Sequence, residues 1–335
     1  MDNNLYYRKK ILIIGGTGTI GKQLLIELLK CEPEVVRVFS RDEYKQFELQ
    51  QELGSISNIR YLIGDVRDQQ RLLMAMEDID FVFHLAAMKH VPACEYNPFE
   101  AVKTNVIGTQ NVIQAALDAG VKRVLFTSTD KAIAPTNAYG ATKLTAERLI
   151  SAANYQKGPK KTIFSSVRFG NVMGSRGSVI PLFKKQILGK GYITITNKEM
   201  LRYMMTPSQA ISLILEANEK AIGGEVFVLK MPIIKLGDLA EIMIEEISDK
   251  FELNNIVDIK EIGLRPGEKM YEELMTEDEI RIAYETNNMY IIPPTYTKYK
   301  ADHDSYLIKE IPIVSKEKAI EKEMLKNWIL KEMII

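Results

Sequence analysis

Four residues in one short stretch of the chain have side chains suited to moving protons. Asp130 and Lys131 are adjacent, and Tyr139 and Lys143 follow as a Tyr-x-x-x-Lys pair. Residues four apart on a helix share a face, so if Tyr139 opens a helix, the Lys143 ammonium would lie beside the phenol. A nearby positive charge favours the phenolate and would lower the Tyr139 pKa from its usual value of about 10. Tyr139 could then accept a hydroxyl proton while a hydride leaves the same carbon.

The adjacent acid and base indicate a second reaction. Oxidation by hydride transfer needs only the Tyr, so Asp130 and Lys131 suggest that a step such as loss of water follows it. A Tyr-x-x-x-Lys pair alone occurs often by chance and equally describes a solvated helix face. Two contexts favour chemistry: a predicted strand at residues 124–128 ends just before Asp130, and a glycine-rich loop lies near the N-terminus.

The glycine-rich loop follows a predicted buried strand at residues 10–14 and precedes a helical pattern with Leu at 24, 25, 28 and 29. Glycines at 16, 18 and 21 fit G-x-G-x-x-G, and those at 15, 18 and 21 fit G-x-x-G-x-x-G. Such glycines let the backbone approach a pyrophosphate on the helix N-terminus; a tight turn without a ligand is the alternative. The cofactor-binding residues expected here are Gly15, Thr17, Gly18, Thr19, Ile20 and Gly21.

The end of the second predicted strand, at residues 35–39, bears on which nicotinamide cofactor would bind. An acidic residue there usually binds the ribose 2′-hydroxyl of NAD, and an Arg accommodates the 2′-phosphate of NADP. Ser40, Arg41 and Lys45 favour NADP, while Asp42 keeps NAD as the weaker alternative.

Asp65 and Val66 follow a third predicted strand at residues 60–63. This position would let Asp65 reach the adenine of the cofactor. Capping of the next helix by Asp65 is an equal alternative, because Asp is a preferred N-cap residue.

Strand-like runs alternate with helical patterns to about residue 170, which predicts an α/β fold with a Rossmann-type, doubly wound parallel sheet. We expect residues 1–172 to form an NADP-binding domain, completed by a returning segment near 200–230. Residues 173–335 would then form a smaller α/β substrate-binding region with a C-terminal helix. That helix is predicted at 315–335, capped by Ser315, with Ile320, Met324, Trp328 and Met333 packing on the body or on a neighbouring subunit.

The composition excludes several classes of protein. The chain has 335 residues with 44 basic and 44 acidic side chains, so nothing favours a nucleic acid or an anionic membrane as partner. Two cysteines offer no disulfide framework and the three histidines are scattered, so we expect no metal. His84 lies in an apolar run and is expected in the core. Without an 18-residue apolar run or a signal-peptide pattern, we expect a cytoplasmic protein.

Six motifs in order make the chain similar to the extended short-chain dehydrogenase/reductase family. Within it, the chain most resembles the soluble, inverting UDP-N-acetylglucosamine 4,6-dehydratases of pseudaminic acid synthesis, from about residue 10 to about 295; the last 40 residues do not match. The motifs are Ser-Arg-Asp-Glu at 40–43, Gly-Asp-Val-Arg-Asp at 64–68, Lys-His-Val-Pro at 89–92, Ser-Thr-Asp-Lys-Ala at 128–132, Asn-Val with Gly-Ser-Arg-Gly-Ser at 171–178, and Arg-Pro-Gly-Glu-Lys at 265–269.

The resemblance implies a role for each member of the proton-handling group. Tyr139 would remove the C4 hydroxyl proton of the sugar, and Lys143 would hold the nicotinamide ribose. Lys131 would take the C5 proton and Asp130 would protonate the leaving C6 hydroxyl. The cofactor would finish each turnover oxidised, because the hydride returns to C6.

The resemblance also implies which residues hold UDP-N-acetylglucosamine, and it implies a homo-oligomer. Arg side chains can bind the two phosphates of UDP through paired N–H groups. For Arg265, a surface ion pair with Glu268 is an alternative. A retaining dehydratase and a UDP-hexose 4-epimerase are the competing enzymes, and a non-catalytic NADP-sensing regulator is a remote alternative. The substrate-binding residues implied are Lys89, Thr129, Asn171, Arg176, Ser178, Arg265 and Glu268.

Overall fold

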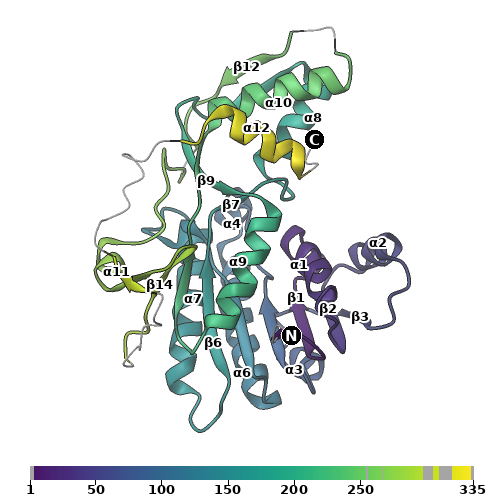
Figure 1. The fold of residues 1–335 in the computed structure, drawn as a ribbon, viewed down its shortest axis with the longest axis vertical. Coiled ribbons are helices and arrows are strands. Elements are labelled where there is room, and N and C mark those ends of the chain that lie inside the picture. The colour runs from purple at the N-terminus through teal and green to yellow at the C-terminus, as the bar shows by residue number, and fades with distance from the viewer. Residues whose placement is uncertain (1–3, 254–255, 266, 297–304, 309–318, 333–335) are drawn as a thin grey trace. The chain divides into compact units, whose positions relative to one another are not determined.

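The computed structural model describes residues 4–253, 256–265, 267–296, 305–308 and 319–332 (Figure 1). The chain divides into two compact units. The first comprises Met1–Phe169, Ile211–Leu229 and Met275–Lys309, and the second comprises Gly170–Ala210, Lys230–Leu274 and Glu310–Ile335. Two segments from the later part of the chain therefore belong to the first unit.

A parallel sheet organises the first unit (Figure 1). Its parallel strands lie in the order β3-β2-β1-β4-β5-β6-β10, which is the Rossmann arrangement expected from the alternating pattern. All the strands predicted in the sequence for this sheet are confirmed, with ends shifted by at most one residue. Their bounds are β1 Lys10–Ile14, β2 Val35–Ser40, β3 Ile59–Ile63, β4 Phe81–His84, β5 Arg123–Thr127, β6 Ile163–Arg168 and β10 Val226–Leu229.

Beyond β10 the sheet continues with antiparallel strands that the sequence pattern did not reveal. β14 (Met289–Ile292) pairs with β10, β13 (Tyr284–Glu285) pairs with β14, and β15 (Tyr306–Leu307) pairs with β13. Two of these strands have only two residues, too short for a period-2 pattern to be recognised.

Helices of the first unit join the strands and bury apolar side chains against the sheet. Phe39, Phe126 and Phe164 are among the fully buried side chains of this core, and each contributes roughly 2–3 kcal/mol by leaving water. His84 is fully buried as well, which confirms the expectation that it is a core residue. The helices are α1 Thr19–Leu29, α2 Glu43–Leu53, α3 Gln69–Met76, α4 Val91–Tyr96, α5 Pro98–Ala101, a π-helix Val102–Ile107, α6 Gly108–Ala119, a 3₁₀ turn Asp130–Ala132, α7 Ala138–Gln156, α9 Pro207–Lys220 and α11 Glu277–Ile282.

The second unit has its own core, in which Phe183, Ile193 and Leu239 are fully buried. β11 (Ile233–Lys235) and β7 (Asn171–Val172) flank β9 (Leu201–Met205), and β8 (Tyr192–Ile195) pairs in parallel with β12 (Asp258–Glu261). Its helices are α8 Val179–Lys190, α10 Leu236–Lys250 and α12 Lys322–Lys331.

The C-terminal helix differs from its prediction. Ser315 and Met333 lie outside the described residues. Helix α12 begins only at Lys322, because two residues earlier the N–H of Ile320 is donated to Ile233 O at 2.8 Å instead of to a helical carbonyl.

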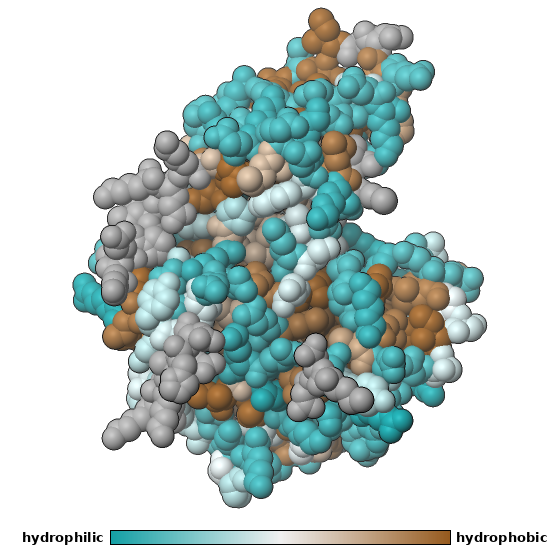
Figure 2. Space-filling model, in the orientation of Figure 1, coloured by the Kyte–Doolittle hydropathy of each residue, from teal (hydrophilic) through white to brown (hydrophobic). Residues whose placement is uncertain are grey.

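The face of α12 that is buried also differs. Met324 is 48% exposed, and the side chains that enter the core are Leu325 and Ile329, with Trp328 packed beside them. Lys322 pairs with Glu241 of α10 at 2.7 Å, and Figure 2 shows a hydrophilic surface over these two helices.

Among the described residues, no helix is both long enough and apolar enough to cross a membrane.

Candidate active site

The 3₁₀ turn after β5 holds the adjacent acid and base together. Lys131 Nζ lies 3.0 Å from Asp130 Oδ1, and Thr129 Oγ1 donates to the same oxygen at 3.0 Å. The backbone N–H of Asp130 donates to Phe169 O at 3.1 Å, which fixes the turn to the end of β6. Asp130 is fully buried, and its Oδ2 has no hydrogen-bond partner among the described residues. A buried carboxylate oxygen without a partner is costly, so this atom is suited to a ligand hydroxyl.

Helix α7 brings Tyr139 to this turn. Asn137 caps the helix by accepting a hydrogen bond from Gly140 N at 2.9 Å, and Tyr139 is the second helical residue, as predicted. A Cβ added at Gly140 would lie 2.0 Å from Lys131 O. Only glycine therefore lets the helix approach the turn this closely. Thr129, Lys131 and Asp130 all affect the pKa of Tyr139, so these side chains lie close together at the turn.

Lys143 does not act on Tyr139 as expected. Its Nζ donates to Thr127 O at 2.5 Å and lies 3.9 Å from the centre of the Phe126 ring. Burial lowers the pKa of Lys143 to about 7. Burial also raises the pKa of Tyr139, against the lowering effects of Thr129 and Lys131. The prediction that Lys143 lowers the Tyr139 pKa is therefore wrong, because desolvation outweighs the favourable charges.

A buried asparagine that sequence reasoning missed joins the loop after β4 to α7. Asn105 Oδ1 accepts from Met88 N at 2.8 Å, and Asn105 Nδ2 donates to Met88 O and to Thr142 Oγ1, both at 3.0 Å. Asn105 lies in the π-helix, a feature frequent at functional sites. The predicted substrate residue Lys89 follows Met88 directly and is exposed, so Asn105 fixes the backbone that carries it. A π-helix has no signal in single-sequence periodicity.

The loop between β1 and α1 fits a dinucleotide pyrophosphate. A Cβ at Gly15 would lie 2.8 Å from Ala86 N, and one at Gly21 would lie 2.6 Å from Gly15 O, so packing of the protein itself requires these glycines. Gly18 is different: it is exposed, its Cβ would contact only Gly15 O at 3.3 Å, and it caps α1 without a side chain. That open backbone would accommodate a phosphate at the helix N-terminus. Thr17, Thr19 and Ile20 complete the loop and the first turn.

The residues after β2 surround the position expected for the cofactor ribose. Asp42 caps α2 by accepting from Lys45 N at 3.0 Å, and its carboxylate also pairs with Lys45 Nζ. Ser40 Oγ accepts from Gln46 Nε2 at 3.1 Å. Arg41 is exposed and lies 3.6 Å from Asp65. The Asp42 carboxylate, which would favour NAD, is thus already bonded to Lys45 of α2.

Asp65 is not a helix cap. Asp68 caps α3 by accepting from Arg71 N at 2.9 Å, so the capping alternative for Asp65 is wrong. Asp65 instead pairs with Arg67 at 2.7 Å. Val66 is 4% exposed and packs in the core, which leaves only its backbone for a cofactor contact.

The remaining predicted substrate residues belong to the second unit. Asn171 Nδ2 donates to Tyr203 O at 2.9 Å. Ser178 is the N-cap residue of α8 but makes no capping bond, and its buried hydroxyl has no partner among the described residues.

The loop at 265–268 is held by Glu268. Its carboxylate accepts from Arg265 N at 3.2 Å and pairs with Arg202 at 3.7 Å. Arg202, an additional cation at this loop, was missed because it is distant in sequence. Arg265 is exposed, and Arg176 lies in the loop before α8.

A second buried ion cluster joins helix α7, strand β6 and helix α11. Arg168, at the end of β6, is fully buried and donates to Glu147 of α7 at 2.6 and 3.2 Å and to Glu279 of α11 at 2.9 and 3.0 Å. Burial would raise the pKa of Glu279, but the hydrogen bond and charge of Arg168 outweigh it, so that pKa is lowered. This cluster was also missed, because nothing local in the sequence pairs residues 111 positions apart.

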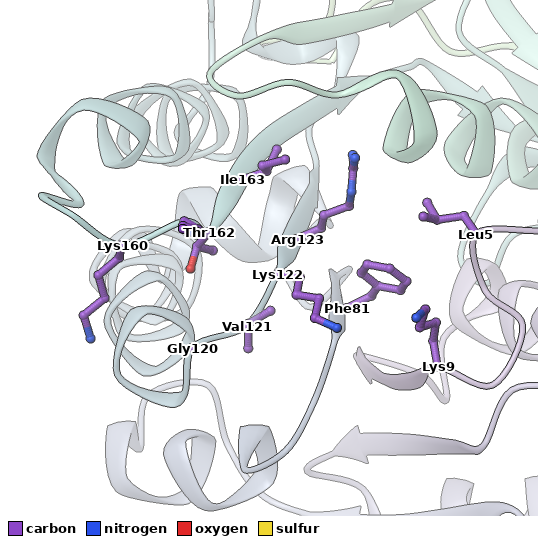
Figure 3. Close-up of a pocket in the computed structure, with 11 residues that line it drawn as sticks. Leu5, Lys9, Phe81, Gly120, Val121, Lys122, Arg123, Lys160, Thr162 and Ile163 are labelled. Carbon is purple, nitrogen blue, oxygen red and sulfur yellow. The ribbon is translucent and has the colours of Figure 1, made fainter.

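A cavity of about 450 Å³ in the first unit is lined by Phe81, Arg123 and Ile163, the first residues of β4, β5 and β6 (Figure 3). Lys122 beside it pairs with Asp80 at 2.6 Å, and Arg123 donates to Asn218 O and Ala221 O. These parallel strands run from the cavity toward Asp130 and Lys143. The cavity therefore lies at the N-terminal ends of the strands, and the proton-handling group lies at their C-terminal ends.

Comparison with curated proteins finds close relatives. The chain is 44% identical over 305 residues to UDP-N-acetylglucosamine 4,6-dehydratase (inverting) of Campylobacter jejuni, covering 90% of this chain and 87% of the relative. It is 49% identical over 331 residues to the uncharacterized membrane protein MJ1061 of Methanocaldococcus jannaschii, covering 97% of both. It is 39% identical over 304 residues to UDP-glucose 4-epimerase of Rickettsia conorii, covering 88% of this chain and 87% of that protein.

Solved structures agree on the fold. The X-ray structure of Pen from Bacillus thuringiensis matches with a TM-score of 0.91 and 57% identity, covering 99% of both chains. The dTDP-glucose 4,6-dehydratase DesIV from Streptomyces venezuelae matches with a TM-score of 0.71 and 22% identity over 81% of this chain and 90% of that one, a likeness that shows the fold alone. The predicted Rossmann-type fold and the short-chain dehydrogenase/reductase resemblance are confirmed. Since residues 11–294 also match the family described as polysaccharide biosynthesis protein, the chain belongs to that family.

Proposed function

We propose that the chain is an NADP-dependent UDP-N-acetylglucosamine 4,6-dehydratase that inverts C5. The observation that carries the proposal is the ion pair of Asp130 and Lys131 beside Tyr139, in a chain 44% identical to a relative of that name. A hydride-transfer enzyme needs no such pair. An enzyme that eliminates water needs one acid for the leaving hydroxyl and one base for the adjacent C–H bond.

The first step is oxidation of C4 of the sugar. Tyr139 accepts the proton of the C4 hydroxyl, and Lys143, held by Thr127 O, contacts the cofactor ribose. When bound, the nicotinamide supplies the redox chemistry by taking a hydride from C4 and returning it to C6. The resulting C4 ketone acidifies the hydrogen at C5.

The second step is loss of water. Lys131, in its neutral form, takes the C5 proton while Asp130, in its protonated form, gives its proton to the C6 hydroxyl, which leaves as water. The side chain of Lys131 is 23% exposed and that of Asp130 is fully buried. The base can therefore exchange its proton with solvent, whereas the acid is protected from it. Such protection favours delivery of the Asp130 proton to the substrate.

Two features support NADP over NAD. Asp42, the acidic residue that would bind a 2′-hydroxyl, caps α2 and pairs with Lys45. Arg41 is exposed beside Ser40, where it can turn toward a 2′-phosphate.

Residues of the second unit would hold the UDP-sugar. The hydroxyl of Ser178, which has no partner in the described part of the chain, stands at the N-terminus of α8, a helix of 12 residues, where anions bind well. Arg265 and Arg176 would add forked contacts to the phosphates, and Glu268 orders the loop of Arg265. Asn171 and Lys89 would contact the sugar. The substrate class and the family suggest a role in surface polysaccharide or flagellin glycan synthesis, with pseudaminic acid as one product.

A 4-epimerase is the second candidate, because a relative 39% identical carries that name. An epimerase would return the hydride to C4 and leave the C6 hydroxyl in place. Asp130 and Lys131 would then have no proton to transfer.

Nuclear magnetic resonance of the product formed from UDP-N-acetylglucosamine and NADP in deuterated water separates these activities. The proposal predicts a C4 ketone, a C6 methyl group, deuterium at C5 and inverted C5 configuration. The same product with C5 retained would identify a retaining dehydratase. UDP-N-acetylgalactosamine with its C6 hydroxyl intact would establish epimerisation and refute the proposal, as would the absence of turnover.

A further inference from the structure

The cavity at the N-terminal ends of β4, β5 and β6 is lined by an excess of positive charge. Five of the 11 residues that line it are lysine or arginine and none is acidic, although the whole chain carries 44 basic and 44 acidic residues. Its volume of about 450 Å³ lies within the range of small-molecule sites, about 300–1,000 Å³. The cationic lining residues are Lys9, Lys122, Arg123, Lys160 and Lys161.

The same cavity has an apolar wall. Phe81 and Val121 are buried, and Leu5 and Ile163 are half-buried beside them. Figure 3 shows the Phe81 ring among the cationic side chains that line the cavity. A Cβ added at Gly120 would meet no atom within 4 Å, so the space next to the end of α6 is open. An aromatic or aliphatic group would leave water by packing against this wall.

Two of the cations are partly used by helix ends. Lys160 Nζ donates to Leu117 O in the last turn of α6. Arg123 Nη1 donates to Asn218 O at 2.6 Å and to Ala221 O at 2.8 Å, at the end of α9. The C-terminus of a helix carries a partial negative charge. Lys160 and Arg123 therefore offset the negative ends of two helices, which would otherwise repel an anion.

Carboxylates lie near the cavity but do not line it. Asp80 pairs with Lys122 at 2.6 Å, and the charge of Lys9 also acts on Asp80. Asp118 lies 3.7 Å from Lys160. The carboxylates whose charge interacts with Arg123 are Glu219 and Glu225. These acids balance part of the positive charge from outside the cavity and leave the lining itself cationic.

Three cations have hydrogen-bond donors to spare. In the part of the chain that the structure describes, Lys9 Nζ and Lys161 Nζ make no hydrogen bond and no ion pair within 4.0 Å. Arg123 uses only Nη1, which leaves Nε and Nη2 without an acceptor among the described residues. Ammonium and guanidinium groups form their strongest hydrogen bonds with anionic oxygens. The spare donors and the apolar wall together define the chemistry of a ligand.

We propose that this cavity is a second binding site, for a small amphipathic anion. Its aromatic or aliphatic body would pack against Phe81 and Ile163, and its carboxylate, sulfonate or phosphate group would meet the cations of the lining. The site is separate from the proton-handling group, because β4, β5 and β6 run from the cavity to that group at their other ends. It does not depend on the function proposed above. A ligand bound here stabilises the folded chain.

A fluorescent probe with this chemistry, anilinonaphthalene sulfonate, tests the proposal in an equilibrium titration. Its neutral analogue phenylnaphthylamine has the same aromatic body without the sulfonate. Both are titrated into the chain saturated with NADP and UDP, so that nucleotide sites are occupied. We expect saturable binding of one sulfonate probe per chain, and the probe should also raise the midpoint of thermal unfolding.

The cations are tested with a double variant and a matched control. Lys9→Gln with Lys161→Gln should weaken the sulfonate probe by about tenfold or more and leave the neutral analogue unchanged. Lys30→Gln with Lys198→Gln removes the same charge from two exposed lysines outside the cavity. This control should bind both probes as the unmodified chain does.

The apolar wall is tested with Ile163→Ala. Loss of part of the wall should weaken both probes by a similar factor, roughly fivefold, because both share the aromatic body. A variant that weakens neither probe would show that they bind elsewhere, and the proposal would fail.

Three other results would overturn the proposal. Equal weakening in the cavity double variant and its control would show only general attraction to a positive protein. Displacement of the sulfonate probe by NADP or UDP would place it in a nucleotide site. Displacement by vesicles of phosphatidylglycerol, with the same dependence on Lys9 and Lys161, would assign the cations to a membrane surface instead of a free small anion. None of these measurements uses dehydratase activity, so the proposed function stands or fails separately.

Discussion

Two buried ion clusters lie beside or on helix α7, and they differ in how many of their carboxylate oxygens accept hydrogen bonds. Arg168 makes four hydrogen bonds to Glu147 and Glu279, and every carboxylate oxygen of that cluster accepts one. Asp130 accepts two bonds on Oδ1 and none from the described residues on Oδ2. A fully bonded cluster is expected to hold α7, β6 and α11 together. An incompletely bonded one is available to a ligand. We therefore expect the Arg168 cluster to stabilise the fold and the Asp130–Lys131 pair to take part in catalysis.

We expect the largest effect from Asp130→Asn, which should reduce the rate of dehydration but leave the stability of the fold nearly unchanged. Because an amide cannot supply a carboxylic acid proton, dehydration of UDP-N-acetylglucosamine should slow by roughly 10²–10⁴-fold. The free energy of unfolding should change by less than about 1 kcal/mol, since the substitution removes a buried charge and Lys131 can reach solvent. Product formation and urea unfolding of the same preparation measure both. A stability loss like that of an Arg168 variant would abolish the distinction between the clusters.

Arg168→Met should show the opposite pattern. Two buried carboxylates would lose their partner, which costs about 3–5 kcal/mol of stability. The control is Arg148→Met: Arg148 also pairs with Glu279, at 3.2 Å, but its side chain is 55% exposed, so less than about 1 kcal/mol is expected. Urea unfolding compares the two. Equal losses would show that the Arg168 cluster contributes no more than a surface ion pair.

Gly140→Ala tests the contact that joins α7 to the Asp130–Lys131 turn. The new Cβ would meet Lys131 O, so the turn must shift, at a cost of about 1–3 kcal/mol and with a loss of dehydration. Ala141→Gly is the matched control on the exposed side of the same helix turn. It should cost about 1 kcal/mol by helix propensity and retain activity. An active Gly140→Ala protein would show that the close approach is dispensable for chemistry.

The smallest effect is expected at the cofactor ribose, outside both clusters. Arg41→Ala should reduce the preference for NADP over NAD by about tenfold, equivalent to about 1.4 kcal/mol, without altering stability. Arg67→Ala serves as control, because Arg67 also pairs with Asp65 but follows β3. Binding titrations with both cofactors give the ratio. An unchanged ratio in Arg41→Ala, or the same change in both variants, contradicts the assignment.

Local patterns predicted much of the fold. The apolar run before the glycine-rich loop identified β1, further apolar runs identified β2, β3 and β5, and the leucine pattern after the loop identified α1. The predicted start of α12 was wrong. The N–H of Ile320 is hydrogen-bonded to Ile233 O, a tertiary contact that helical periodicity in the sequence does not predict.

The candidate site was only partly predictable. The sequence brings Asp130, Lys131 and Tyr139 near one another because only a short connection separates β5 from α7. It could not reveal that burial would raise the Tyr139 pKa, since desolvation depends on packing by distant residues. Asn105 and Arg168 were missed for a related reason: their partners lie between 17 and 111 positions away.

Lys131→Ala tests whether Lys131 removes the C5 proton, the step on which the dehydratase proposal depends. The variant should be incubated with UDP-N-acetylglucosamine and NADP in deuterated water, with cofactor reduction and C5 exchange recorded together. Lys122→Ala, which removes an exposed lysine before the other end of β5, is the control and should behave as the unmodified chain. We expect that Lys131→Ala still reduces the cofactor but shows no C5 exchange and no dehydrated product. Retention of both C5 exchange and dehydration would contradict it.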